Sequence, residues 1–175
     1  MRQLLALMCV LVLASGALGG IEGSTVSLIE PWTVPDPLEP ATFRFYVQCT
    51  ASDSYVITGV IIGFHNQYTL LDDTMGWDPG PNWEDSVGTW EMWTGSAPGL
   101  HEAYWAFGEL VDGEDFYIYI DAMNDPDKRD DMGIINWTLV GNAAGQDPVQ
   151  VTGVIDMSAS PMEFDTWGAI KSLYR

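Results

Sequence analysis

Glycine and proline interrupt this chain so often that it has little room for long helices. The 175 residues include 18 glycines and 10 prolines, and downstream of the N-terminal segment the longest stretch without either is 41–58. Within that stretch Phe43, Phe45 and Val47 recur at every second position, which is the period of a half-buried strand. We therefore expect a fold built mainly from short strands.

The same patterns recur along the rest of the chain, separated by turn dipeptides such as Asp112-Gly113 and Gly141-Asn142. The expected strands cover 25–30, 41–50, 55–64, 68–71, 89–93, 102–107, 116–122, 133–140 and 149–157. About nine short strands at even spacing are typical of a sandwich or barrel. We predict an all-β, antiparallel, immunoglobulin-like β-sandwich of about nine strands.

Two segments break this rhythm. The segment 31–40 carries four prolines and is expected to be an extended connection, since proline cannot donate to a sheet. The segment 72–88 is rich in glycine and proline and is expected to be a loop. Loops of that length in compact domains are often functional.

The N-terminus has the pattern of a secretory signal peptide. Arg2 precedes a short apolar run, Leu4 to Leu13, and small residues follow it, so cleavage is expected after Ala17 or Gly19. The apolar run is too short to span a membrane, and no later segment is long enough. We predict a signal peptide over 1–19, one domain over 20–165 and a tail over 166–175, in a protein that is secreted or held at the cell surface.

The charge excludes some partners. The net charge is −19, and the field of such a chain repels phosphates, which argues against nucleic acids and anionic membranes as ligands. Removal of the signal peptide leaves Cys49 as the single cysteine, so no internal disulfide is expected. Cys49 continues the alternation of its strand and is expected to be buried.

The closing part of the chain carries a family resemblance. The run Gly133 to Asn142, which contains Trp137-Thr138-Leu139, is followed by a second strand pattern over 149–155. This pair resembles the closing hairpin of secreted bacterial immunoglobulin-like sandwiches, and the tail 166–175 resembles the short Trp-Gly-x-Ile-Lys endings of some secreted bacterial proteins. The resemblance implies an extracellular domain for adhesion, display or spacing, without catalytic residues to carry over.

Acidic residues are concentrated between 109 and 131, which suggests a calcium loop. Ca²⁺ takes six to eight oxygen ligands, and loops with Asp and Asn at close spacing can supply them. The candidate ligands are Asn124, Asp125, Asp127, Asp130 and Asp131. The interpretation that we favour is a solvated acidic loop that keeps the protein soluble, with calcium binding as the alternative.

Tryptophan is also unevenly distributed, with five of the eight between 77 and 105. Exposed indole faces can cover the apolar faces of sugar rings, while carboxylates accept hydrogen bonds from sugar hydroxyls. Trp77, Trp83 and Trp93 are the candidates for such a site. The alternative is that these side chains belong to the core or anchor loops.

Catalytic patterns are weak. Glu91 and Glu102 are the best pair for glycoside hydrolysis, and no histidine lies in a nucleophile motif. We therefore predict a non-enzymatic extracellular binding or structural module whose partner is unknown. A carbohydrate-binding module is the first alternative and a small glycoside hydrolase the second.

Overall fold

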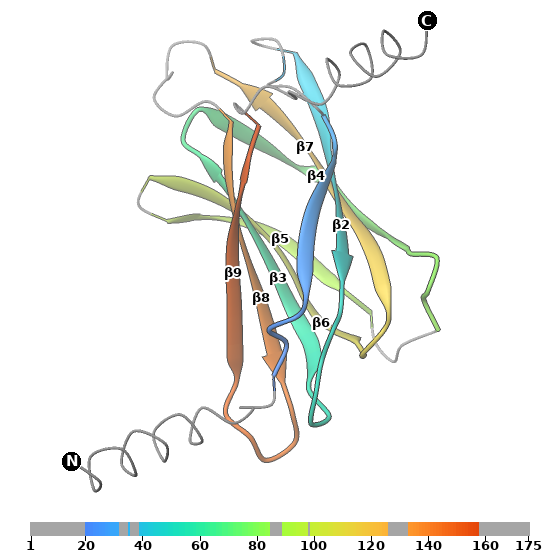
Figure 1. Cartoon of the computed structure of the whole chain (residues 1–175). Coiled ribbons are helices and arrows are strands. Elements are labelled where there is room, and N and C mark those ends of the chain that lie inside the picture. The colour runs from blue at the N-terminus through green and yellow to red at the C-terminus, as the bar shows by residue number, and fades with distance from the viewer. Residues whose placement is uncertain are drawn as a thin grey trace, which may run out of the picture.

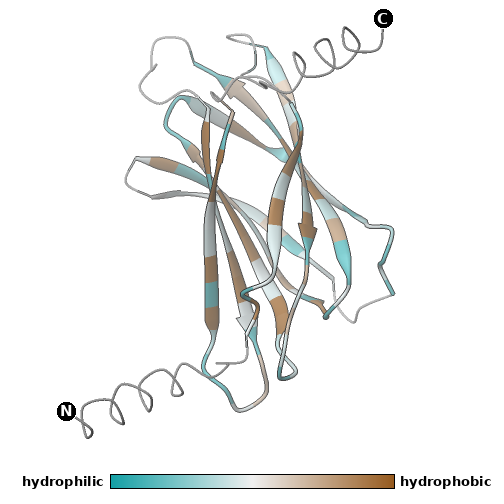
Figure 2. Cartoon of the chain, viewed as in Figure 1, coloured by the Kyte–Doolittle hydropathy of each residue, from teal (hydrophilic) through white to brown (hydrophobic). Residues whose placement is uncertain are grey.

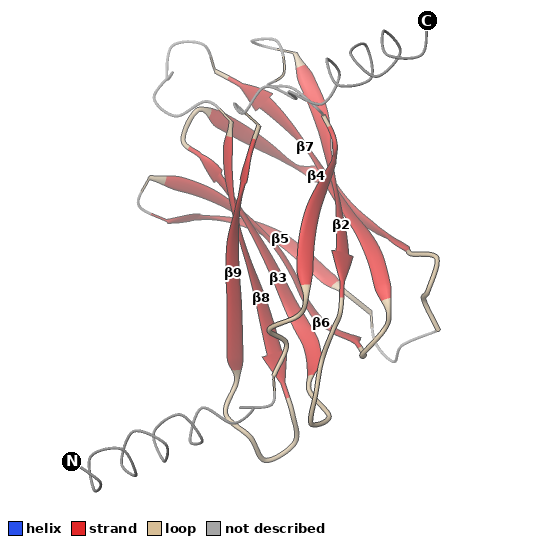
Figure 3. Cartoon of the chain, in the orientation of Figure 1, coloured by secondary structure: helices blue, strands red, loops and turns tan. Residues whose placement is uncertain are grey.

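The structure is a computed structural model that describes residues 20–31, 35, 39–84, 89–97, 99–125 and 133–157. These residues form strands and no helix, so none of them provides a helix able to cross a membrane (Figure 3). The strands are β1 (Thr25–Glu30), β2 (Pro40–Gln48), β3 (Val56–His65), β4 (Tyr68–Pro79), β5 (Glu91–Ala97), β6 (Leu100–Leu110), β7 (Asp115–Asn124), β8 (Ile134–Asn142) and β9 (Val149–Asp156).

The strands make two facing sheets (Figure 1). The four-stranded sheet has the order β1-β2-β7-β4, the five-stranded sheet has the order β5-β6-β3-β8-β9, and every pairing is antiparallel. Several connections cross from one sheet to the other, so the two layers are closed over a shared interior. The predicted antiparallel, immunoglobulin-like sandwich is confirmed.

The core lies between the sheets and is made by the alternate residues that the sequence marks as apolar. Phe43, Phe45 and Val47 of β2 are fully buried, and apolar bands follow the strands in Figure 2. The ring of Phe43 lies edge-on to Phe64, with centroids 5.1 Å apart. Cys49 is buried as expected, and burial raises the pKa of its thiol to about 11.

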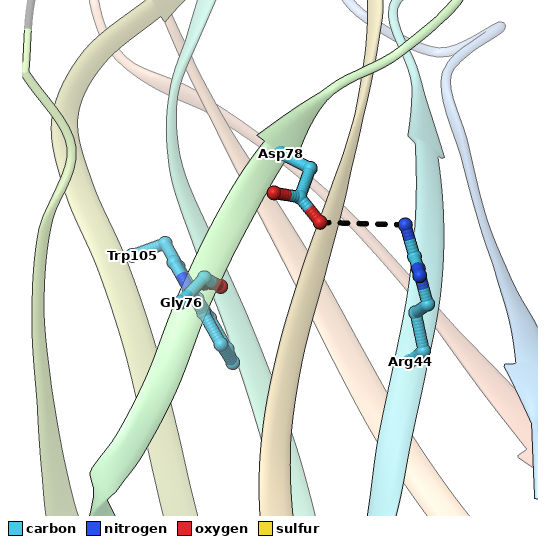
Figure 4. Close-up of polar contacts among 4 residues, drawn as sticks. All are labelled: Arg44, Gly76, Asp78 and Trp105. Atoms are coloured by element: carbon cyan, nitrogen blue, oxygen red, sulfur yellow. Dashed lines mark hydrogen bonds and ion pairs between the residues drawn. The ribbon is translucent and has the colours of Figure 1, made fainter.

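Two polar contacts fix β4 to its neighbours (Figure 4). The indole nitrogen of Trp105 in β6 donates to the carbonyl oxygen of Gly76 at 3.0 Å, which links the two sheets inside the core. On the outer side, Arg44 pairs with Asp78 at 3.4 Å and lies over the ring of Tyr117. Arg44 is the only lysine or arginine among the described residues.

The predicted loop over 72–88 is wrong for its first half, because β4 continues to Pro79. The pairing with β7 shifts between Leu71 and Gly76, and the Thr74 hydroxyl fills the gap by accepting a hydrogen bond from the backbone N–H of Asp121 at 2.8 Å. β4 is an edge strand, where proline is tolerated. Residues 80–84 do form a loop, and 85–88 lie outside the described residues.

The predicted signal peptide (1–19) and tail (166–175) also lie outside the described residues. The division of the chain into these three parts therefore stays a prediction.

Candidate functional site

A β-bulge in β6 places an aromatic side chain on the outer face of the five-stranded sheet. The pairing of β6 with β3 shifts between Ile57 and Gly59, and Phe107 in the shifted segment has a φ of 66°. The next residue, Gly108, faces inward, and a Cβ there would overlap the indole of Trp90. The bulge reverses the strand alternation, so that Phe107 points to solvent and Gly108 makes room for Trp90.

Three side chains, Phe107, Trp93 and Tyr104, form what we call the aromatic row. Trp93 lies directly across from Tyr104 in the β5–β6 ladder, with ring centroids 5.3 Å apart and planes within 6° of parallel. The ring of Phe107 lies 6.1 Å from that of Trp93 at an interplanar angle of 29°. Phe107 is 69% exposed and Trp93 40%.

The rings of the aromatic row overlap only in part. Rings in face-to-face contact are about 3.5 Å apart, so centroids 5.3 Å apart imply a sideways offset of about 4 Å. The larger separation between Phe107 and Trp93 implies a larger offset. Trp93 and Phe107 keep 40% and 69% of their surfaces exposed, so a flat apolar ligand can contact the row.

Carboxylates flank the aromatic row along the strands. The hydroxyl of Tyr104 donates a hydrogen bond to Oε2 of Glu102, and this bond, helped by burial, raises the pKa of Tyr104 to about 12. Glu91 lies opposite Ala106, at the Phe107 end. The row is thus an apolar strip with acceptor oxygens at both ends.

The same two carboxylates were the candidates for glycoside hydrolysis. Glu91 pairs with Ala106, whereas Glu102 pairs with Gly95, so the two acids are four residues apart along β5. That corresponds to about 13 Å along the strand, with Trp93 between them. Hydrolysis needs two carboxylates about 5–10 Å apart, so this arrangement does not favour it.

The structure brings Trp77 and Trp83 together but places Trp93 elsewhere. The rings of Trp77 and Trp83 lie 5.3 Å apart, and both pack against the core. Trp93 lies on the outer face of the other sheet, with Tyr104 and Phe107, which sequence reasoning missed as site residues. As expected from the alternation, Trp90 and Trp93 point to opposite faces, with Trp90 only 2% exposed.

Two buried carboxylates organise the loop that carries Trp83. Asp115 accepts hydrogen bonds from the Tyr46 hydroxyl at 2.5 Å and from the Asn82 backbone at 3.1 Å. Its neighbour Glu114 accepts from the backbone of Glu84 at 3.0 Å. An open depression of about 430 Å³ lies beside this loop; its lining residues are Pro81, Asn82, Trp83, Glu84, Val111, Asp112, Gly113 and Glu114. Because both carboxylates accept hydrogen bonds from neighbouring groups of the protein, their role here is structural.

The predicted calcium loop lies mostly outside the described residues. Asn124 and Asp125 are described, at the end of β7, whereas Asp127, Asp130 and Asp131 are not. Among the described residues, no group of three or more acidic, histidine or cysteine side chains is arranged to hold a metal ion. Calcium binding by this loop stays a prediction.

Comparison with known proteins supplies structural likenesses only. No family model matches this sequence, and neither does any curated protein. Among solved structures, the chain is similar to BcpA, the major pilin subunit of Bacillus cereus, at 9% identity and a TM-score of 0.47, over 76% of this chain and 39% of that one. It is also similar to a collagen-binding domain of a Staphylococcus aureus adhesin, at 12% identity and a TM-score of 0.38, over 81% and 99% of the two chains.

A third similar structure is AvmM, which catalyses macrocyclization in alchivemycin A biosynthesis, at 10% identity and a TM-score of 0.37, over 81% and 93% of the two chains. At these TM-scores the likenesses carry no argument about function, which has to come from the site itself.

Proposed function

We propose that this chain is a non-enzymatic extracellular binding module and that the aromatic row is its contact surface. The observation that carries the proposal is Phe107, which is both 69% exposed and held at a φ of 66°. For a side chain other than glycine, the left-handed region costs about 1–2 kcal/mol. Because the ring of Phe107 lies mostly in solvent, its burial offsets little of this conformational cost.

Non-glycine residues at positive φ cluster at functional sites, and exposed apolar side chains that lie together mark interaction surfaces. Three further features support the proposal: the bulge that turns Phe107 outward, the parallel rings of Trp93 and Tyr104 beside it, and the signal-peptide pattern at the N-terminus. The separation of Glu91 from Glu102 supports binding rather than hydrolysis.

The proposal predicts the sign of a stability change. Phe107→Gly is expected to leave the free energy of unfolding equal to that of the wild type or to raise it by up to about 1 kcal/mol, because glycine adopts positive φ without strain. Urea unfolding followed by circular dichroism measures it. A decrease of about 1 kcal/mol or more in the free energy of unfolding would show that the Phe107 side chain stabilises the fold, and would contradict the proposal.

A matched control is available in the turn between β2 and β3. Ser54 is exposed and has a φ of 63°, so Ser54→Gly relieves a similar strain at a residue outside the aromatic row. We expect Ser54→Gly to stabilise the fold to a similar degree and to leave ligand binding unchanged.

A further inference from the structure

We infer that the ligand of the aromatic row is a neutral polysaccharide, whose sugar rings lie on Trp93 and Phe107 while its hydroxyls reach Glu102 and Glu91. This inference rests on the proposed function and names the class of partner for the same surface. A pyranose ring has an apolar face of C–H groups and a rim of hydroxyls. The site offers the complement of both: flat aromatic faces in the middle and carboxylate acceptors at the ends.

The geometry of the row suits a chain of rings better than a single ring. Its two centroid separations, 5.3 and 6.1 Å, extend the aromatic surface across neighbouring positions of β5 and β6. On the neighbouring strand β3, the outward positions beside the row are Gly59, Ile61 and Gly63, with Ile61 opposite Tyr104. The face beside the row therefore carries one apolar side chain between two positions that have none.

The charges near the row favour a neutral ligand over an anionic one. Arg44, the one described lysine or arginine, lies in β2 of the other sheet. An acidic polysaccharide would meet Glu91 and Glu102, with no described lysine or arginine on the same sheet to offset their charge. Tyr104 donates to Oε2 of Glu102, which orients the carboxylate and leaves Oε1 to accept a sugar hydroxyl.

A cationic peptide is the competing class, since ammonium groups also bind aromatic faces and carboxylates. The structure favours the sugar because peptide recognition uses pockets for individual side chains, and no described pocket is lined by the aromatic row. The two open depressions are lined by other residues: one beside Trp83 and one of about 300 Å³ between β4 and β5.

The experiment uses the secreted chain and affinity electrophoresis, followed by calorimetry, on a panel of soluble polymers. The neutral probes are hydroxyethyl cellulose, glucomannan, xylan, laminarin and pullulan; heparin and oligolysine represent the anionic and cationic classes. We expect binding to at least one neutral polymer and none to heparin. Affinity for the neutral polymer is expected to change less than threefold between low and high salt, because salt screens charge interactions only.

Variants locate the site. Trp93→Ala and Phe107→Gly are each expected to weaken binding at least tenfold, and Glu102→Gln to weaken it less. The control is Val154→Ser in β9 of the same sheet, which removes another exposed apolar side chain (62% exposed) three strands away from β6 and is expected to bind as the wild type does. Circular dichroism confirms that each variant is folded.

The outcomes separate the two proposals. Failure to bind any neutral polymer, or salt-sensitive binding of oligolysine through Trp93, overturns the neutral polysaccharide as ligand but leaves the aromatic row as the contact surface. Binding of any probe that is unchanged by both Trp93→Ala and Phe107→Gly overturns the ligand assignment and the proposed function together.

Discussion

Replacing Asp115 with alanine is expected to lower the free energy of unfolding by about 3 kcal/mol, because buried donors to a carboxylate lose their acceptor. Asp115 has no exposed surface. It accepts hydrogen bonds from the Tyr46 hydroxyl and, through both oxygens, from the backbone and side chain of Asn82. The backbone oxygen of Asp115 also accepts from Gly80, so this residue ties the loop after β4 to β7.

The stability that the Asp115 carboxylate contributes should depend on pH in a defined direction. Burial alone raises the pKa of Asp115, but the hydrogen bonds from Tyr46 and Asn82 together outweigh it, so the pKa in the folded state lies below its usual value of 3.8. A carboxyl with a depressed folded pKa stabilises the fold above its unfolded pKa, and this contribution is lost as the pH falls through the folded pKa.

Urea unfolding of the wild type and of Asp115→Asn between pH 6 and pH 3 measures this effect. We expect the stability of the wild type to fall more steeply on acidification than that of the variant. The control is Asp121→Asn in the same strand, whose carboxylate accepts one exposed hydrogen bond from Thr42; we expect it to cost under about 1 kcal/mol. Parallel acid profiles for the wild type and Asp115→Asn would contradict the role of this carboxylate.

The architecture was predictable because strand patterns are local. In β2, Phe43, Phe45 and Val47 alternate with outward residues, and this period alone predicts which side chains reach the core. The opposite orientation of Trp90 and Trp93 follows from the same rule. Turn residues then separate one strand from the next, which is why a strand was expected at each of the nine observed ones, although β4 was expected to end at 71 and extends to Pro79.

β4 shows where local signals fail. Gly76 and Pro79 suggest a loop, but the strand persists because of contacts made by distant residues. The ring of Tyr119 in β7 occupies the space in which a Cβ at Gly76 would lie, and Trp105 in β6 donates to the carbonyl of Gly76. Sequence alone cannot show that a glycine is there to admit a tyrosine ring.

The aromatic row was missed for a related reason. Period-two alternation places Phe107 on the same side as Ala103 and Trp105, both of which are buried, and so predicts an inward side chain. Only the bulge turns it outward. Tyr104, in contrast, could have been paired with Trp93 from the sequence, by counting equal numbers of residues on each side of the turn between β5 and β6. This register was the one signal in the sequence that pointed to the row.

The glycine that permits this bulge should be the most sensitive position near the row. Gly108→Ala is expected to lower the free energy of unfolding by about 2–3 kcal/mol, because its Cβ would overlap the indole of Trp90 inside a packed core. The indole cannot retreat freely, since it stacks on Phe116 with centroids 4.7 Å apart. The control is Gly63→Ala in the neighbouring β3, where a Cβ has ordinary contacts at 3.6 Å and little loss is expected.

A second substitution tests the stated cause. Trp90→Ala removes the indole atoms Cε2, Cδ2 and Nε1 that lie nearest a Cβ at position 108, and it breaks no described hydrogen bond, because the buried indole nitrogen has no partner among the described residues. In the double variant, the new methyl group of Gly108→Ala should occupy part of the space that the indole vacates. We therefore expect a double-mutant cycle, measured by urea unfolding, to give a favourable coupling of at least about 1 kcal/mol. Additive losses would show that position 108 acts through its backbone freedom rather than through Trp90, and the link between the core and the outward turn of Phe107 would then be lost.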